Sequence, residues 1–275
     1  MGEQIEFWIP IPPSTAYQKI PDARIQSELP FDVRSDSPYG NRFLHYASDF
    51  LDEDLALKIN WQAQTSVRQN LPSEAPAPNQ QDYLKSTRMQ NMTPTIKTLA
   101  QKLCQGKPSS RAKAEALYAY VLEHISLDTT ESVTVGQGNS EAAYKNTTGQ
   151  PSDLTALFVA LTRASGIPAN FVSGLRLPTA HAAATANFHC WAEFYDSTEG
   201  WIPVDVAAAI QEKNVSANYF GHLDAARLEL VKGRDLTLNP PQKDAPLNLM
   251  WLPYVEVNGK AVSDIIARWS YTVGP

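Results

Sequence analysis

His189 and Asp205 are the two side chains whose types and spacing best fit catalytic chemistry. His189 lies near the start of Phe188–Tyr195, and Asp205 ends Trp201–Asp205; both segments have the composition and alternation of strands. The short connection 196–200 between them predicts a β-hairpin. An imidazole that is oriented by a carboxylate can act as a general base, so this pair is the first candidate for a site.

The expected hairpin register places the two residues on one face. Successive side chains of a strand point to opposite faces, so His189, Trp191 and Glu193 share one face while Cys190 points to the other. In a hairpin that is symmetric about its loop, Asp205 lies opposite Trp191 and diagonal to His189, within hydrogen-bonding reach. A His and an Asp on neighbouring strands are also common as ordinary polar surface, so spacing alone leaves both interpretations open.

The other reactive residue types form no recognisable site. Cys104 and Cys190 have neither the spacing of a disulfide framework nor that of metal ligands, and the five histidines contain no H-E-x-x-H pattern. We therefore expect no metal and no cofactor, and we expect Cys104 to fill a core position. The remaining histidines are interpreted as surface or capping residues: His45, His124, His181 and His222.

Two helical segments are expected well before the hairpin in the sequence. Thr95–Gln105 and Arg111–Ile125 carry apolar residues at three- and four-residue spacing. Gly106 suits the left-handed residue just past a helix end, and Ser110 is the expected N-cap of the second helix. The polar stretch 129–149 that follows contains Gly136 and Gly138, but it lacks the third glycine of a phosphate-binding motif, and we interpret it as loop.

A third helix is expected to begin at Pro151, because proline is favoured at the first helical position. Its apolar stripe consists of Leu154, Leu157, Phe158 and Leu161. The helix is expected to end at Gly166-Ile167-Pro168, and the strand Phe171–Leu175 follows.

The N-terminal part of the chain predicts a different kind of structure. Its short extended segments are broken by prolines, which favours a small β-sandwich; they are Ile5–Ile9, Phe43–Tyr46 and Leu55–Trp61. The stretch Leu71–Asn79 is rich in proline and small residues, as surface linkers are. We therefore expect a β-sandwich-like domain over residues 1–78 and a core domain with a C-terminal extension over residues 79–275.

Bulk composition limits the partners. The chain has 275 residues, 43% of them apolar, which is enough for two domains with their own cores. The net charge of −6 and the absence of a run of Lys or Arg exclude a typical nucleic-acid binder. No stretch of about 18 apolar residues predicts a membrane span. We expect a cytoplasmic protein from the chain as written, and an extracytoplasmic one if a secretory signal precedes Met1. The oligomeric state is not indicated.

From Gly149 onward the sequence resembles the transglutaminase-like superfamily, including its bacterial two-domain members described as cysteine proteases. The family motifs G-x-C-x-D, L-F-x-x-L-x-R-x-x-G-I-P-A, H-x-W-x-E and G-W-x-P-V-D occur in order, at Gly149–Asp153, Leu157–Ala169, His189–Glu193 and Gly200–Asp205. Similarity extends from about residue 82 to residue 259. It implies an α+β fold, in which an N-terminal β-sandwich precedes a papain-like core of helices packed on an antiparallel sheet.

The resemblance also assigns roles within this core. In the family, a cysteine at a helix start attacks an amide; His189 matches its base, and Asp205 matches the residue that orients the base. Pro151 stands where the family has the cysteine. Proline has no nucleophilic atom and no backbone N–H with which to hold an oxyanion.

The sequence therefore favours a catalytically inactive transglutaminase-like protein that uses the fold to bind or scaffold a protein or peptide ligand. Trp191 and Trp201 are the candidate binding residues. The alternative is an active hydrolase or acyltransferase on peptide or amide substrates with a relocated nucleophile, for which Ser152 is the weak candidate. One helical step rotates the Ser152 side chain by about 100° from that of Pro151. A third interpretation makes the hairpin purely structural and assigns any function to the N-terminal domain.

Overall fold

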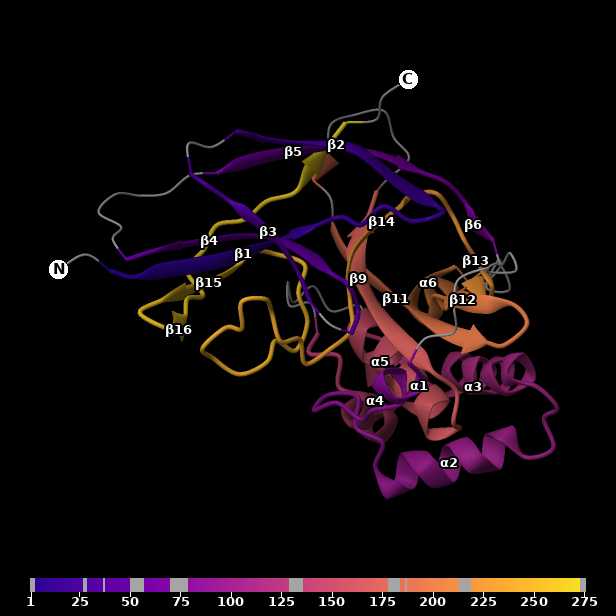
Figure 1. Ribbon diagram of the computed structural model, residues 1–275. Helices are drawn as coiled ribbons and strands as arrows, with labels where there is room; N and C mark the ends of the chain where they lie inside the picture. The colour runs from indigo at the N-terminus through magenta and orange to yellow at the C-terminus, as the bar shows by residue number, and fades with distance from the viewer. Residues whose placement is uncertain are drawn as a thin grey trace. The chain divides into compact units, whose positions relative to one another are not determined.

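The computed structural model describes most of the chain (Figure 1). The described residues are 3–26, 29–36, 38–49, 57–69, 79–128, 136–177, 184–185, 187–212 and 219–272. The chain divides into two compact units, Met1–Ser66 with Ser173–Phe188 and Ala226–Pro275, and Val67–Val172 with His189–Ala225. Residues 71–78 of the expected linker lie outside the described residues, so the division at residue 78 stays a prediction.

The helices of the described residues lie in the second unit. They are α1 (Gln80–Tyr83), α2 (Pro94–Cys104), α3 (Ser110–His124), α4 (Ser140–Asn146), α5 (Pro151–Ala164) and α6 (Val206–Gln211). The three long helices confirm the expected segments to within a residue or two. The interpretation of 129–149 as loop is wrong at α4, a helix of seven residues that is too short to show a full apolar stripe.

The ends of α2 and α3 show how the sequence sets their bounds. Gly106 follows α2 with a φ of 73°, the left-handed conformation that glycine adopts without strain. The N-cap of α3 is Ser109, whose Oγ accepts a hydrogen bond from the Ala112 backbone N–H at 3.1 Å. The expectation of Ser110 as the N-cap is therefore wrong by one residue, because either serine could have taken that position.

Helix α5 is the centre of the second unit. Its residues are apolar on nearly all sides, and a helix of this kind is stable only when it is surrounded. It contacts α2, α3, α4 and α6, and its fully buried Leu154, Leu157 and Phe158 belong to the main apolar cluster. Each such side chain contributes roughly 1.5–3 kcal/mol of burial free energy, so the position of α5 is firmly set.

A four-stranded sheet carries the predicted hairpin. Its order is β12-β11-β9-β14, with β9 (Ala169–Arg176), β11 (Asn187–Asp196), β12 (Gly200–Val204) and β14 (Arg227–Lys232). β11 and β12 pair antiparallel from Ala192 opposite Val204 to Asp196 opposite Gly200, which confirms the hairpin. Two short pairs lie within the second unit: β6 (Arg68–Gln69) with β13 (His222–Leu223), and β7 (Ser126–Leu127) with β8 (Thr148–Gly149).

The first unit contains a five-stranded sheet and two smaller strand pairs. The sheet order is β16-β15-β1-β4-β3, with β1 (Ile5–Ile11), β3 (Asp32–Ser35), β4 (Arg42–Ser48), β15 (Tyr254–Val257) and β16 (Lys260–Ala261). β2 (Gln18–Gln26) pairs with β5 (Lys58–Thr65), and β10 (Ala184–Thr185) pairs with β17 (Ser270–Tyr271). The predicted α+β class is confirmed.

The N-terminal strands bury a core between the five-stranded sheet and the β2–β5 pair. Ile5, Phe7 and Ile9 of β1 form an apolar cluster against which Ile59 and Trp61 of β5 pack. β15 pairs directly with β1, although the two strands lie at opposite ends of the chain. The sheet expected for the N-terminal domain is thus completed by C-terminal residues, which local sequence patterns do not reveal.

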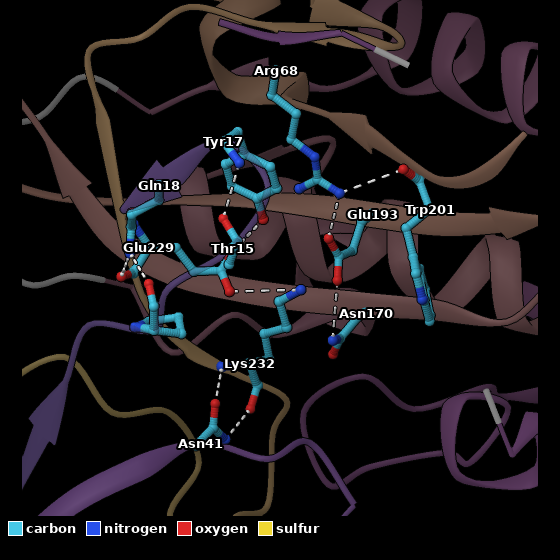
Figure 2. A network of polar contacts seen from close by, with 11 residues as sticks. Thr15, Tyr17, Gln18, Asn41, Arg68, Asn170, Glu193, Trp201, Glu229 and Lys232 are labelled. Atoms are coloured by element: carbon cyan, nitrogen blue, oxygen red, sulfur yellow. Dashed lines mark hydrogen bonds and ion pairs between the residues drawn. The ribbon is translucent and has the colours of Figure 1, made fainter. Parts of the chain in front are cut away.

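Buried polar contacts join β14 to the segment around β2 within the first unit (Figure 2). The backbone N–H of Glu229 donates to Gln18 Oε1 at 2.7 Å, and Gln18 Nε2 donates to the Glu229 carbonyl at 3.0 Å. The Tyr17 hydroxyl donates to the Glu229 carboxylate. The side chain of Gln18 thus satisfies both backbone groups of Glu229, as buried polar groups require.

Candidate functional site

The structure brings His189 and Asp205 together. His189 Nε2 lies 2.5 Å from Asp205 Oδ2, and the two residues are only 7% and 0% exposed. The regular pairing of the hairpin ends at Ala192 opposite Val204, and one further step in the same register sets Trp191 opposite Asp205. This is the diagonal arrangement expected from a symmetric hairpin. The catalytic role of the pair stays a prediction.

Asp205 also begins helix α6. Its Oδ1 accepts a hydrogen bond from the Ala208 backbone N–H at 2.9 Å, which makes it the N-cap, and its own N–H donates to the Tyr219 carbonyl at 2.9 Å. Both carboxylate oxygens therefore have fixed partners. The sequence signal for this second role is an Asp followed by a run of small and apolar residues, Val206–Ile210, as at a helix start.

The charge of Asp205 affects the pKa of Tyr118, a residue of α3. The Tyr118 side chain is buried, and this burial raises the pKa of its phenol well above the ordinary value. The negative charge of Asp205 raises the Tyr118 pKa further, followed by a smaller effect of Tyr219. Tyr118 is therefore neutral at physiological pH.

The imidazole of His189 has one nitrogen free of the carboxylate. Because an ionised Asp205 only accepts hydrogen bonds, Nε2 carries the proton, and Nδ1 of the neutral ring carries a lone pair. The rings of His189 and Trp191 lie 6.4 Å apart, which agrees with their position on one face. Nδ1 can thus accept a proton or a hydrogen bond from a group placed beside it.

Helix α5 begins at Pro151, as expected. Gln150 is the N-cap, and the Asp153 carboxylate accepts a hydrogen bond from its backbone N–H at 3.0 Å. The Thr155 hydroxyl donates to the Pro151 carbonyl at 2.9 Å. Pro151 fits this position without strain because the first residue of a helix needs no N–H donor.

A side-chain contact brings the first turns of α5 next to the hairpin. Thr155 Oγ1 lies 3.5 Å from Cys190 Sγ, and Cys190 directly follows His189 in β11. Cys190 is fully buried, and strand alternation predicts that it faces away from the side of β11 that carries His189. Its thiol therefore packs against the helix.

Ser152, the candidate for a relocated nucleophile, is buried beneath Gly136. Ser152 is 1% exposed, and its Oγ has no hydrogen-bond partner among the described residues. A Cβ added at Gly136 would lie 2.8 Å from Ser152 Oγ and 2.7 Å from Gln150 Cβ. The glycine that we interpreted as loop thus packs directly on the helix start.

Glu193 of the H-x-W-x-E motif has a structural partner that sequence reasoning missed. Arg68 Nη2 donates to Glu193 Oε2 at 2.8 Å, and Asn170 Nδ2 donates to Oε1 at 3.5 Å (Figure 2). Arg68 also reaches the Trp201 carbonyl at 3.4 Å. This buried ion pair joins β6 to the hairpin and fixes the strand that carries His189.

Arg163, in the last turn of α5, also has a structural role. Its Nε donates to the Ala169 carbonyl at 3.0 Å, and its Nη1 donates to the Lys85 carbonyl at 2.8 Å. The Arg163 side chain is buried, and it holds the turn between α5 and β9. Arg163 belongs to the R-x-x-G-I-P-A motif, so the sequence could have indicated that this residue is important.

The two candidate binding tryptophans differ in exposure. Trp191 is 1% exposed and belongs to the main apolar cluster. Trp201 is half-buried, with its ring 5.0 Å from that of Tyr83 and 5.6 Å from that of Tyr195. A role in binding stays a prediction for both, and Trp201 has the surface that such a role needs.

The remaining candidates lie in unrelated surroundings. Cys104 packs in the core with its Sγ 3.2 Å from Ser165 Oγ. His45 Nε2 lies 2.9 Å from Glu6 Oε1 on the neighbouring strand, and His124 Nδ1 lies 3.0 Å from the Tyr120 carbonyl. His222 lies in β13, and His181 falls outside the described residues.

Two features are absent from the described part of the chain, a metal site and a membrane helix. No group of three or more His, Cys, Asp or Glu side chains there could hold a metal ion. No helix of that part combines the length and apolar character that crossing a membrane requires.

Comparison with known proteins agrees with the resemblance. Residues 97–206 match the family model of the transglutaminase-like superfamily. An uncharacterised protein of Haemophilus influenzae is 26% identical over 303 residues, covering 93% of this chain and 81% of that protein. The crystal structure of a candidate cysteine protease from Cytophaga hutchinsonii has a TM-score of 0.63 at 15% identity, covering 100% of this chain and 87% of its own.

The periplasmic domain of TgpA from Pseudomonas aeruginosa is more distant. It has a TM-score of 0.42 at 17% identity, with 78% of this chain and 73% of that chain covered. The Cytophaga hutchinsonii structure confirms the expected fold, and the family match confirms the resemblance of the core.

Proposed function

We propose that this protein, whose residues 97–206 belong to the transglutaminase-like superfamily, performs no acyl transfer and binds a peptide or protein ligand at the site around His189 and Asp205. The observation that carries the proposal is Pro151 at the first position of α5. The family resemblance places the nucleophilic cysteine at that position.

The substitution removes two parts of the reaction. Proline has no atom that can attack a carbonyl, and it has no backbone N–H that can hold the oxyanion of a tetrahedral intermediate. The loss of one oxyanion donor alone typically costs about 2.7–4 kcal/mol of transition-state stabilisation. The helix itself accepts proline at Pro151, so the fold is kept where the chemistry is lost.

The retained imidazole supports a binding role. The buried Asp205 carboxylate holds Nε2 of His189 at 2.5 Å, so the ring has one orientation. Its Nδ1 accepts a hydrogen bond from an amide N–H when the ring is neutral, and donates to a carbonyl or carboxylate when the ring is protonated. A peptide offers both kinds of partner, which is why we choose this ligand class.

The environment of Ser152 weighs against the alternative of an active hydrolase or acyltransferase with a relocated nucleophile. A nucleophilic serine needs hydrogen-bonding contact with its base and access to the substrate. Ser152 is buried against Gly136, and no hydrogen bond joins it to His189 among the described residues. Cys190 is fully buried beside Thr155.

A turnover assay tests the absence of acyl transfer. The purified protein and its His189→Ala variant are compared in amide hydrolysis and in amine incorporation into casein, and both are expected to equal the blank. A fluorophosphonate probe followed by peptide mapping is expected to leave Ser152 unmodified. Turnover that His189→Ala abolishes, or a Ser152 adduct that His189→Ala prevents, would overturn the proposal.

A ligand titration tests the binding role separately. The protein is labelled with ¹⁵N-histidine, and a casein hydrolysate serves as the peptide mixture. We expect the imidazole resonances of His189 to shift in a saturable way, while those of His124 on α3 stay unchanged. Resonances of His189 that do not move at millimolar peptide would contradict peptide binding at this site.

A further inference from the structure

We infer that residues 136–139 form a cover over Ser152 in the first turn of α5, that Asp153 helps to hold this cover in place, and that solvent or a ligand reaches the Ser152 side chain only when the cover is released. The inference goes beyond the proposed function, because it concerns access to Ser152 and not the His189–Asp205 pair. The cover itself is defined by contacts of residues 136–139 with Gln150, Ser152 and Asp153.

The packing of Gly136 leaves no space between the cover and the helix. A Cβ at this position would lie 2.7 Å from Gln150 Cβ, 2.8 Å from Ser152 Oγ and 2.9 Å from Asp153 Oδ2. Real Cβ atoms essentially never approach so closely, so any residue other than glycine requires the segment or these side chains to shift. Ser152 is 1% exposed as a result.

The Asp153 carboxylate binds the cover and the helix at once. Its Oδ1 accepts a hydrogen bond from the Asn139 backbone N–H at 2.6 Å, and its Oδ2 accepts one from the Gln150 N–H at 3.0 Å. Bonds to an ionised acceptor are about twice as strong as neutral ones. The bond to Asn139 is one contact that must break for the cover to leave.

The far end of the cover is fixed. Asn139 is the N-cap of α4, with its side chain accepting from the Ala142 N–H at 3.0 Å, and the Ser140 N–H donates to the Met89 carbonyl at 2.9 Å. Gly138 precedes this anchor with a φ of 66°. A glycine between an anchored helix and a packed segment can absorb the change in backbone angles that release requires.

The closed state carries a cost that favours release. Ser152 Oγ is buried and has no hydrogen-bond partner among the described residues. An unsatisfied buried hydroxyl is unfavourable, and it regains a partner when water or a ligand replaces Gly136. The Asp153 carboxylate therefore stabilises the closed cover, whereas the Ser152 hydroxyl can form a hydrogen bond once the cover is removed.

Thiol labelling of the full chain tests the cover without any ligand. Ser152→Cys places a thiol beneath Gly136, and iodoacetamide modification at position 152 is followed by peptide mapping. We expect slow labelling in this variant and about tenfold faster labelling when Gly136→Ala is added, because the new Cβ displaces the segment and raises the open population. Gln101→Ala is the control, since the Gln101 side chain is exposed on α2 of the same unit and outside the cover, and it is expected to leave the rate unchanged.

The buried Cys190 is the internal reference for unfolding, because it lies in the same unit and is fully buried. Acceleration at position 152 with an unchanged Cys190 rate supports the cover. Fast labelling at position 152 before Gly136→Ala is added, no effect of Gly136→Ala, or equal acceleration at Cys190 would each overturn it. The test needs no turnover and no ligand, so its failure is distinct from a failure of the proposed function.

Discussion

The Asp205 carboxylate has two structural roles. One oxygen orients the His189 ring, and the other caps α6 through the Ala208 N–H. Because both partners are buried, the residue is needed for stability even in a protein without catalysis. Retention of the pair is therefore expected under either functional interpretation, and it does not by itself indicate an enzyme.

Replacement of Asp205 tests this dual role. Asp205→Ala removes a helix cap and leaves the His189 ring without its partner, so we expect a loss of about 2–4 kcal/mol in the free energy of unfolding. Asp205→Asn keeps a capping oxygen and is expected to lose clearly less. Urea unfolding measures both variants, and equal losses for them would contradict the assigned capping contact.

The Tyr118 phenol makes stability depend on alkaline pH. Burial first, and then the Asp205 charge, raise the pKa of Tyr118 in the folded protein. A raised folded-state pKa gives stability that is complete below the unfolded value of about 10 and is lost as pH rises above it. We expect Tyr118→Phe to lose less stability than the parent between about pH 9 and 11, measured by urea unfolding. Identical pH profiles would contradict the effect.

At the scale of elements, the ion pair of Arg68 and Glu193 connects β6 to the hairpin. Both side chains are buried, so removing one partner leaves an uncompensated charge. This pair fixes the strand that carries His189.

We expect Arg68→Ala to lower the free energy of unfolding by about 3–5 kcal/mol. Arg34→Ala, which breaks the exposed pair with Asp32, is expected to cost less than about 1 kcal/mol. Adding Glu193→Leu to Arg68→Leu should recover part of the loss, because no charge then stays buried. Urea titrations of the four variants check this, and similar costs for Arg68→Ala and Arg34→Ala would contradict it.

The sequence predicted those elements whose signals are local. The long helices α2, α3 and α5 show a 3.6-residue pattern, and the hairpin register follows from its own symmetry, so His189 and Asp205 could be paired in advance. The short helices α4 and α6 span fewer than two full turns and show no complete stripe.

Tertiary contacts explain what the sequence did not show at the site. The bond from Arg68 to Glu193 spans 125 positions of the chain, and Gly136 packs on the α5 start across an intervening helix, α4. No periodicity encodes such contacts. The burial of Ser152 and the structural roles of Glu193 and Arg163 therefore became visible only with the fold.

At the scale of the whole molecule, the chain ends share one sheet. β15 pairs with β1 in the register that sets Ile5 opposite Val257, so the N-terminal strands depend on residues more than two hundred positions away. The first unit also includes residues of 173–188, and the chain crosses between the units more than once.

A fragment of residues 1–78 tests this dependence. It lacks β15 and leaves one side of β1 unpaired, so we expect no cooperative unfolding transition and weak near-ultraviolet dichroism from Trp8 and Trp61. The full chain is the control, under the same buffer conditions. A sigmoidal urea transition for residues 1–78 alone would instead support an independent N-terminal domain with its boundary at residue 78.

In the proposed function, Pro151 is a local replacement in a site whose other residues are intact. Pro151→Cys tests this directly, with iodoacetamide labelling at position 151 followed across pH and the buried Cys104 and Cys190 as background. We expect a thiol pKa clearly below the ordinary value of about 8.5, because the α5 N-terminus and a protonated His189 both favour the thiolate. That shift should shrink when His189→Ala is added. A thiol with an ordinary pKa, insensitive to His189→Ala, would contradict the account.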